Sequence, residues 1–270
     1  ASEVQPLIGS KEGILHITLA FVNPGDEVLV PNPGYPTYTS LSKILGAKVV
    51  NYNLDEDNGW QPDFEELEHR DLSRVKLMWT NYPNMPTGGD ARMETYRKLV
   101  DFARRHDIVV VNDNPYSFIL NDQPLSLLQV EGAKDCCIEF NSMSKGYNMP
   151  GWRVGMCVSN PQFISWILKI KSNIDSGTFR GLQLAAAEAL TTNTEEWHRE
   201  YNINVYRRRR EIAERIMQAL GCTYDDSQVG MFLWGKIADK YANAEQLTER
   251  VLHEARVFIT PGFIFGSNGE

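Results

Sequence analysis

One segment of the chain, Phe140 to Gly155, concentrates side chains that can do covalent and phosphate chemistry. It reads F-N-S-M-S-K-G-Y-N-M-P-G-W-R-V-G, so an apolar run is followed by two serines, one lysine and an arginine in a glycine-rich turn. A lysine amine can hold a carbonyl compound as a Schiff base, and hydroxyls with a guanidinium suit a phosphate. Because the serine–lysine motif is short, it is by itself equally typical of a lysine in a surface loop.

Four further segments carry comparable groups and precede this one in order along the chain. They are Gly9-Ser10-Lys11-Glu12-Gly13, Asn32-Pro33-Gly34-Tyr35-Pro36, Asn81-Tyr82-Pro83-Asn84-Met85-Pro86-Thr87-Gly88 and Asn112-Asp113-Asn114-Pro115-Tyr116. With Ser142-Met143-Ser144-Lys145, Arg153 and Gly155, they resemble the signatures of class I/II aminotransferases of the aspartate and LL-diaminopimelate type. Two residues depart from the family's N-P-x-N-P-T-G loop, namely Tyr82 beside the first proline and Met85 before the second. The resemblance covers nearly the whole chain, more loosely from Gly155 to Gly266.

The resemblance implies pyridoxal 5'-phosphate as cofactor and a catalytic role for three residues. Lys145 would hold the cofactor as a Schiff base and, once displaced by substrate, move a proton between substrate Cα and cofactor C4′. Asp113 would keep the pyridine nitrogen protonated, since a carboxylate raises the pKa of a neighbouring base. Tyr116 and Asn84 would donate hydrogen bonds to the phenolic oxygen.

The resemblance also implies which groups hold the ring and the phosphate. Tyr35 would stack on the pyridine ring. The phosphate would take the backbone N–H groups of a helix that begins at Ser10 and Lys11, the hydroxyls of Ser142 and Ser144, and the Arg153 guanidinium. Structural alternatives stay open for Asp113 as a turn cap, Tyr35 as core or turn filler, and Ser144 as a helix cap.

The elements that must position these groups alternate along the chain. Short apolar runs predict buried strands at Glu27–Val30, Lys48–Tyr52, Val75–Thr80, Ile108–Asn112, Cys136–Phe140 and Val154–Val158. Apolar residues three and four apart predict helices between them, at Thr37–Leu45, Met93–His106 and Gln162–Ile170. This alternation predicts an α/β fold with a mostly parallel sheet sandwiched by helices, and fold-type I is what the resemblance implies. Ligands of such sheets bind beyond the carboxyl ends of the strands.

The sequence pattern changes after Phe179, from short apolar runs to longer helical stretches. Helices are expected at Leu182–Leu190 and Glu196–Leu220, and a further helix at Ala244–Ala255 is expected between strands at Met231–Ile237 and Val257–Thr260. The predicted domains are 1–190, the large cofactor-binding domain, and 191–270, an interdomain helix with part of a smaller α+β domain. Both ends of the sequence look cut, and the family's substrate-carboxylate arginine has no counterpart before Glu270.

Composition narrows the possible partners. With 270 residues and a formal net charge of −8, the chain does not favour nucleic acid or anionic lipid. No signal peptide and no membrane-spanning apolar run is visible. The cysteines Cys136, Cys137, Cys157 and Cys222 are expected to be buried, reduced thiols in a cytoplasmic protein. No histidines lie at metal-ligand spacing, so no metal site is expected.

The function expected from these features is transfer of an amino group from an amino acid to a 2-oxo acid. The stretch Lys171 to Gly177 favours an aspartate- or LL-diaminopimelate-like substrate, and the family favours a homodimer. Two alternatives stay open: a pyridoxal-phosphate-dependent C–S β-lyase, and a domain that binds the cofactor as a sensor without catalysis. The motifs do not separate transamination from β-elimination.

Overall fold

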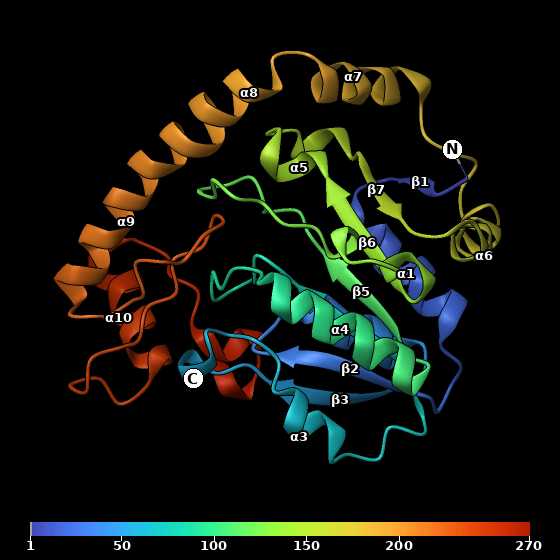
Figure 1. Ribbon diagram of the computed structural model, residues 1–270. Coiled ribbons are helices and arrows are strands. Elements are labelled where there is room, and N and C mark those ends of the chain that lie inside the picture. The colour runs from blue at the N-terminus through green and yellow to red at the C-terminus, as the bar shows by residue number, and fades with distance from the viewer. Residues whose placement is uncertain (1) are drawn as a thin grey trace.

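The computed structural model describes residues 2–270 and contains a seven-stranded sheet with helices on both faces (Figure 1). In chain order the strands are β1 (Val4–Leu7), β2 (Glu27–Asn32), β3 (Lys48–Asn53), β4 (Val75–Asn81), β5 (Val109–Asp113), β6 (Cys137–Ser142) and β7 (Gly155–Val158). Their spatial order is β1-β7-β6-β5-β4-β2-β3. Among the described strands, β7 alone runs opposite to the rest, so it pairs antiparallel with both β1 and β6. The six predicted strands and the mostly parallel sheet are confirmed.

Alternation within the strands builds a separate core on each face of the sheet. In β2, Leu29 belongs to one core, whereas Val28 and Val30 belong to the other. Successive strand residues point to opposite faces, so apolar residues on both faces require two covering layers. The first layer contains α3 (Phe64–Glu68) and α4 (Met93–His106), and the second contains α1 (Ser10–Phe21), α2 (Pro36–Ile44) and α6 (Pro161–Lys171).

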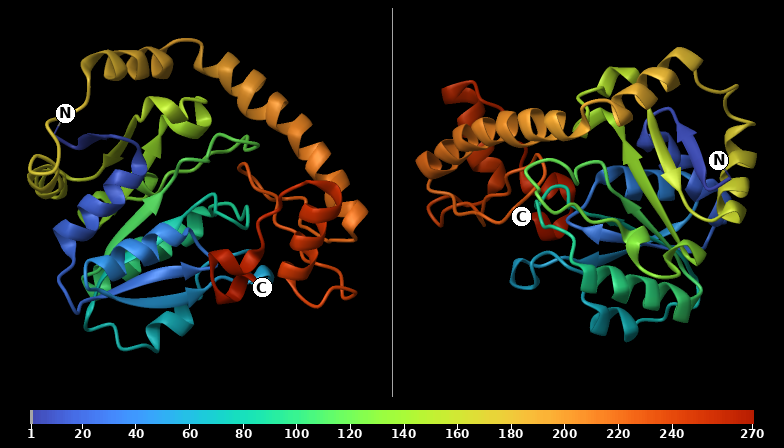
Figure 2. Two further views of the ribbon diagram at one scale, coloured as in Figure 1. Left: turned by 180° about the vertical axis from the view of Figure 1, so that it is seen from behind. Right: turned by 45° about the horizontal axis from the view of Figure 1, so that its top comes forward.

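A long helical segment leads from the sheet to the C-terminal part of the chain. It comprises α7 (Arg180–Thr191), α8 (Thr194–Trp197), a π-helical stretch (His198–Val205) and α9 (Tyr206–Leu220), and it curves around the sheet edge as an arch (Figure 2). The helices predicted at Leu182–Leu190, Glu196–Leu220 and Ala244–Ala255 are confirmed, the last as α10. The boundary predicted after residue 190 stays a prediction, and it falls inside α7.

The strands predicted at Met231–Ile237 and Val257–Thr260 are wrong. Among the described residues, the only bridge in this region joins Thr223 to Lys236. Strands need a neighbouring strand for their backbone groups, but here the Gln228 side chain bonds both the N–H and the C=O of Trp234. Apolar composition alone therefore misled the prediction.

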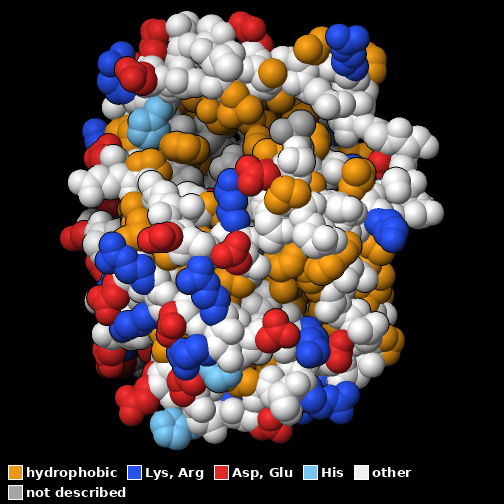
Figure 3. Space-filling model, turned by 45° about the vertical axis from the view of Figure 1, so that its right-hand side comes forward, with side chains coloured by type: hydrophobic (Ala, Val, Ile, Leu, Met, Phe, Trp, Pro, Cys, Tyr) orange, Lys and Arg blue, Asp and Glu red, His pale blue; other side chains and the backbone are white. Residues whose placement is uncertain are grey.

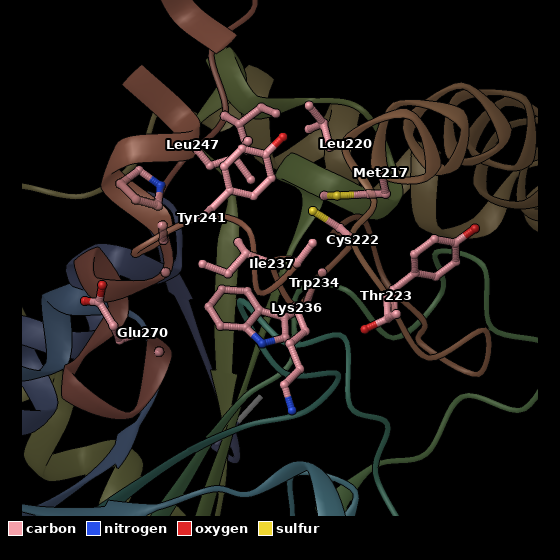
Figure 4. A pocket seen from close by; sticks show the side chains of 18 of the residues that line it. Met217, Leu220, Cys222, Thr223, Trp234, Lys236, Ile237, Tyr241, Leu247 and Glu270 are labelled. Carbon is pink, nitrogen blue, oxygen red and sulfur yellow. The ribbon is translucent and has the colours of Figure 1, made fainter. Parts of the chain in front are cut away.

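A cavity of about 660 Å³ lies between this C-terminal part and residues 55–60, lined by side chains that include Met217, Cys222, Trp234 and Leu247 (Figure 4). Short 3-10 turns complete the described chain at Glu56–Asn58, Leu127–Gln129, Ala133–Asp135, Pro150–Trp152, Gly262–Phe265 and Ser267–Gly269. Across residues 2–270, no helix combines the length and apolar character needed to cross a membrane.

Candidate functional site

One edge of the sheet gathers all of the predicted site residues. Strands β4, β5 and β6 are parallel and end at Asn81, Asp113 and Ser142, with Asn81 directly opposite Asp113. Asn84, Tyr116, Ser144 and Lys145 follow these ends, and Tyr35 follows the end of β2. Because β7 is antiparallel, its first residue, Gly155, lies at the same edge, opposite Ser142 and Leu7. Arg153, Ser10 and Lys11 are thereby brought there as well.

The carboxyl group of Asp113 is buried and only half satisfied. Its Oδ2 accepts a hydrogen bond of 2.9 Å from the Tyr38 hydroxyl, but its Oδ1 is buried without a partner. Burial raises the pKa of Asp113 to about 6, and the bond from Tyr38 opposes that rise. An unpartnered buried acceptor requires an explanation. A cationic N–H donor from a bound molecule would satisfy it.

The start of α1 forms a cradle with Arg153. Gly9 precedes the helix with a φ of 76°, and a Cβ there would lie 2.2 Å from Arg153 Nη2. A Cβ on Gly155 would lie 2.9 Å from the backbone nitrogen of Ser10. Both glycines therefore permit a close approach that larger residues would block. Free N–H groups at a helix N-terminus, next to a guanidinium, form an anion site.

The lysine lies on a short helix, α5 (Met143–Gly146), directly after β6. The Ser142 hydroxyl caps this helix by accepting a 3.2 Å hydrogen bond from the Ser144 N–H. The capping role that the sequence left open for Ser144 thus belongs to Ser142. Lys145 is half-buried, and the carbonyl of the next residue, Gly146, accepts a 2.7 Å bond from Trp197 Nε1.

Asn84 and Tyr116, the two predicted donors to the phenolic oxygen of the cofactor, have different surroundings in the structure. The Asn84 amide is engaged inside its own loop, where it donates to the Asn81 carbonyl and accepts from the N–H and hydroxyl of Thr87. The sulfur of Met85 lies 3.6 Å from the Tyr116 hydroxyl. Burial raises the pKa of Tyr116 well above its ordinary value, so the hydroxyl is a proton donor there.

Tyr38 and Met85 are site residues that the sequence analysis missed. Tyr38 lies in the first turn of α2, three residues after the cap residue Tyr35, and the centroids of the two rings are 5.5 Å apart. Its ring stacks on Trp79 with centroids 4.9 Å apart, and this stacking directs its hydroxyl to Asp113. The spacing was a usable signal for Tyr38. For Met85, only the conformation of its loop shows that the side chain points toward Tyr116.

The structure also groups three possible metal ligands that are distant in sequence. Glu12, His16 and Asp175 place ligand atoms within 4.8 Å of one another. The Lys171 ammonium already pairs with both Glu12 and Asp175 in this cluster. Burial and the charge of Lys171 lower the pKa of His16. The cluster is therefore an ion-paired brace between α1 and α6, in which Lys171 supplies the cation.

The large cavity of the C-terminal part does not contain this site, because none of the predicted residues lines it. The sheet edge is distinguished by its chemistry rather than by the size of a cavity.

Comparison with known proteins agrees with this geometry. A family model described as "Aminotransferase class I and II" matches residues 1–270. LL-diaminopimelate aminotransferases of Aquifex aeolicus (strain VF5) and Dehalococcoides mccartyi (strain CBDB1) are 42% and 41% identical to the chain. Each alignment covers 100% of this chain, which spans 69% of either relative.

Solved structures show the same fold. BacF from Bacillus subtilis superposes with a TM-score of 0.92 and 37% identity, covering 99% of this chain and 68% of BacF. An aminotransferase from Staphylococcus aureus gives 0.91 and 32%, covering 99% of this chain and 70% of the other. The fold-type I architecture is thereby confirmed, and the chain belongs to the class I and II aminotransferase family.

Proposed function

We propose that this chain binds pyridoxal 5'-phosphate at the carboxyl edge of the sheet and uses it to transfer amino groups between an amino acid and a 2-oxo acid. One observation carries the proposal: the buried, unpartnered Oδ1 of Asp113. A pyridinium N–H is the kind of cationic donor that this oxygen lacks. Charge-assisted bonds of this kind are about twice as strong as neutral ones.

Asp113 and Tyr38 together would set the charge of the bound ring. Burial disfavours an isolated carboxylate, whereas a cation against Oδ1 favours the ionised form. Tyr38 holds the carboxyl in place through Oδ2 at 2.9 Å. A bound cationic ring would therefore lower the pKa of Asp113 again and stabilise its ionised form, and the carboxylate would in turn keep that ring protonated.

The other residues of the edge would hold and turn over the ligands. The bound cofactor supplies an electrophilic carbon and an electron sink. Lys145 would attach to that carbon through its amine and later carry a proton to or from substrate Cα. The Tyr116 hydroxyl would donate a hydrogen bond to the phenolic oxygen of the cofactor. Tyr35 would stack on the ring.

The cradle at α1 would bind the phosphate. Its donors are the N–H groups of Ser10 and Lys11 and the guanidinium of Arg153, with the hydroxyls of Ser142 and Ser144 at the neighbouring strand end. Asn84 would be a further donor to the phenolic oxygen: the bonds from Thr87 engage its Oδ1, whereas its amide nitrogen carries two N–H groups and donates one bond, of 3.3 Å, to the Asn81 carbonyl.

LL-diaminopimelate is the substrate that the relatives favour, since those at 40–42% identity carry that name. We propose a dicarboxylic amino acid of this class as the amino donor. We also propose a homodimer, supported by exposed apolar side chains between α6 and α7. A cytoplasmic location is proposed from the four free thiols.

The test begins with reconstitution of the protein with pyridoxal phosphate, followed by borohydride reduction, denaturation and peptide mapping. The reduced cofactor should remain attached to Lys145 alone. Lys145→Ala should lose the covalent colour, whereas Lys169→Ala, at an exposed lysine of α6, should retain it. Colour that survives denaturation in the Lys145 variant would contradict the assignment.

A second experiment addresses the reaction. Addition of LL-diaminopimelate alone should yield the oxo acid and leave the cofactor in its amine form. Release of ammonia and pyruvate from a cysteine conjugate, without amine-form cofactor, would favour the β-lyase. Binding of cofactor with neither reaction would favour the sensor domain.

A further inference from the structure

Two adjacent cysteines, Cys136 and Cys137, direct their sulfurs to the same place. Their Sγ atoms lie 3.7 Å apart. In a continuous strand, neighbouring side chains point to opposite faces, so the predicted strand Cys136–Phe140 would have separated them. In the structure β6 begins only at Cys137, and Cys136 closes the preceding 3-10 turn with φ −136° and ψ 0°. This turn brings the two thiols together.

The two thiols differ in exposure and in acidity. Cys136 is half-buried, whereas Cys137 is fully buried in the core that α4 covers. The contact with Cys137 lowers the pKa of Cys136, and the nearby Arg104 acts in the same direction. The same contact, together with burial, raises the pKa of Cys137. Cys136 is thus both the more accessible and the more acidic of the two thiols, and it is the one that a reagent would meet first.

The other two cysteines lack this arrangement. Cys157 is fully buried, and burial raises its pKa to about 12. Cys222 lines the cavity of the C-terminal part, and burial raises its pKa as well. Among the described residues, no other pair of cysteine sulfurs is in contact. The four cysteines therefore provide one reactive pair and two internal controls.

We propose that Cys136 and Cys137 are a redox-reactive dithiol that hydroperoxides convert to a vicinal disulfide. The Cys136 thiolate attacks the terminal peroxide oxygen, the O–O bond breaks, and the alcohol or water leaves, giving a sulfenic acid on Cys136 after proton uptake. The Cys137 sulfur then attacks the Cys136 sulfur. The S–O bond breaks as the S–S bond forms, and the oxygen leaves as water with the Cys137 proton.

Such a bond would be reversible. Consecutive Cα atoms lie about 3.8 Å apart, below the roughly 4.4 Å at which ordinary disulfides begin. A strained disulfide is readily reduced by thiols, unlike a structural one. This inference does not depend on the proposed transamination, because the pair lies at the opposite end of β6 from Ser142.

The test treats the full, reduced chain with a small excess of hydrogen peroxide. Intact mass should fall by about 2 Da, two of the four free thiols should disappear, and peptide mapping should link Cys136 to Cys137. Dithiothreitol should restore all four thiols. Cys136→Ser should abolish the mass loss, whereas Cys157→Ser and Cys222→Ser should retain it.

Three outcomes would overturn the proposal. One is an unchanged mass loss in Cys136→Ser. Another is a sulfenic acid that persists on Cys136 and is trapped by dimedone, with no loss of the second thiol. The third is a disulfide between two chains on a non-reducing gel. Because Cys136 is half-buried, its serine variant should fold, and circular dichroism provides the check; Cys137→Ser repeats the test from the buried side.

Discussion

At the residue scale, the site depends on groups that folding leaves incompletely satisfied. Asp113 is buried with one oxygen bonded to Tyr38 and the other free, which raises its pKa to about 6. A carboxyl whose pKa in the folded state exceeds its value of 3.8 in the unfolded chain binds its proton more tightly when folded. Its contribution to stability is therefore fully present below about pH 4 and is lost as the pH rises through about 6.

This sign leads to a prediction for Asp113→Asn. At pH 7.5 the cofactor-free variant should be more stable than the parent, by on the order of 3 kcal/mol, because the ionised carboxylate no longer has to be buried. Near pH 4 the difference should vanish. Urea unfolding at the two pH values measures it. Asp122→Asn, at an exposed site, should leave the free energy of unfolding unchanged at both pH values.

Bound cofactor should reverse the order of stability of the parent and Asp113→Asn. Pyridoxal phosphate should stabilise the parent at pH 7.5 much more than Asp113→Asn, since the variant offers no carboxylate to the ring nitrogen. An Asn variant that is less stable than the parent at both pH values would argue that Asp113 is a structural turn residue, as the sequence left open.

Met85 allows a second prediction at this scale. Its thioether, 3.6 Å from the Tyr116 hydroxyl, is a weak acceptor and offers no donor. Met85→Asn should place an N–H beside Tyr116, and a second donor to the phenolic oxygen favours its charged form. The pH at which the bound cofactor changes colour should fall by about one unit. Met85→Leu should leave this midpoint unchanged, and equal shifts in both variants would show that volume, not hydrogen bonding, is responsible.

At the element scale, α5 cannot hold the lysine by itself. It has 4 residues, and isolated helices this short are unstable. The long segment α8 to α9 supports it, because Trp197 Nε1 donates to the Gly146 carbonyl at 2.7 Å. The π-helical stretch adds a second link, in which the Asn202 carbonyl accepts from the Leu120 N–H at 3.1 Å. One segment thus braces both the lysine turn and the loop after Tyr116.

Trp197→Phe tests this support. Phenylalanine retains an aromatic ring against Tyr201, whose centroid lies 4.7 Å from that of Trp197, but cannot donate to Gly146. We expect a loss of about 1 kcal/mol in unfolding free energy and weaker cofactor binding, measured by urea unfolding and by titration of the visible absorption. Trp166→Phe, at a half-exposed tryptophan of α6, is the control. Equal losses in both variants would refute a specific role for Trp197.

At the scale of the whole molecule, the surface near the connection of α6 to α7 exposes large apolar side chains. Ile174, Phe179 and Leu184 expose 51%, 76% and 58% of their surface along the link from α6 to α7. Hydrophobic side chains gather on the side of the molecule that Figure 3 turns forward, around a hollow. Contiguous exposed apolar side chains mark interaction surfaces more often than free surface.

The corresponding prediction concerns assembly. The parent protein should sediment as a dimer, and Phe179→Glu with Leu184→Glu should convert it to a monomer, because buried charges oppose association. Phe258→Glu, at an equally exposed phenylalanine (71%) in the C-terminal part, should leave the dimer intact. A parent chain that is monomeric at micromolar concentration would remove this surface from consideration.

The sequence by itself determined the sheet and predicted which residues form the site. Apolar runs predicted β2 to β7 because a strand that is buried on both faces is apolar along its whole length, whichever strands lie beside it. Asp113, Ser142 and Lys145 were predicted because they belong to motifs that come soon after such runs, and the carboxyl ends of parallel strands converge on one edge. Local pattern was sufficient to place these residues at the carboxyl edge of the sheet.

Only the tertiary structure decided which side chains face one another. It placed the Asn84 Oδ1 against Thr87 and Met85 beside Tyr116, joined Tyr38 to Asp113, and gave the predicted strand at Met231–Ile237 a single bridge, from Lys236 to Thr223, among the described residues. It also brought Cys136 beside Cys137 by starting β6 one residue late. These outcomes depend on backbone angles and on distant partners, which residue type and spacing do not specify.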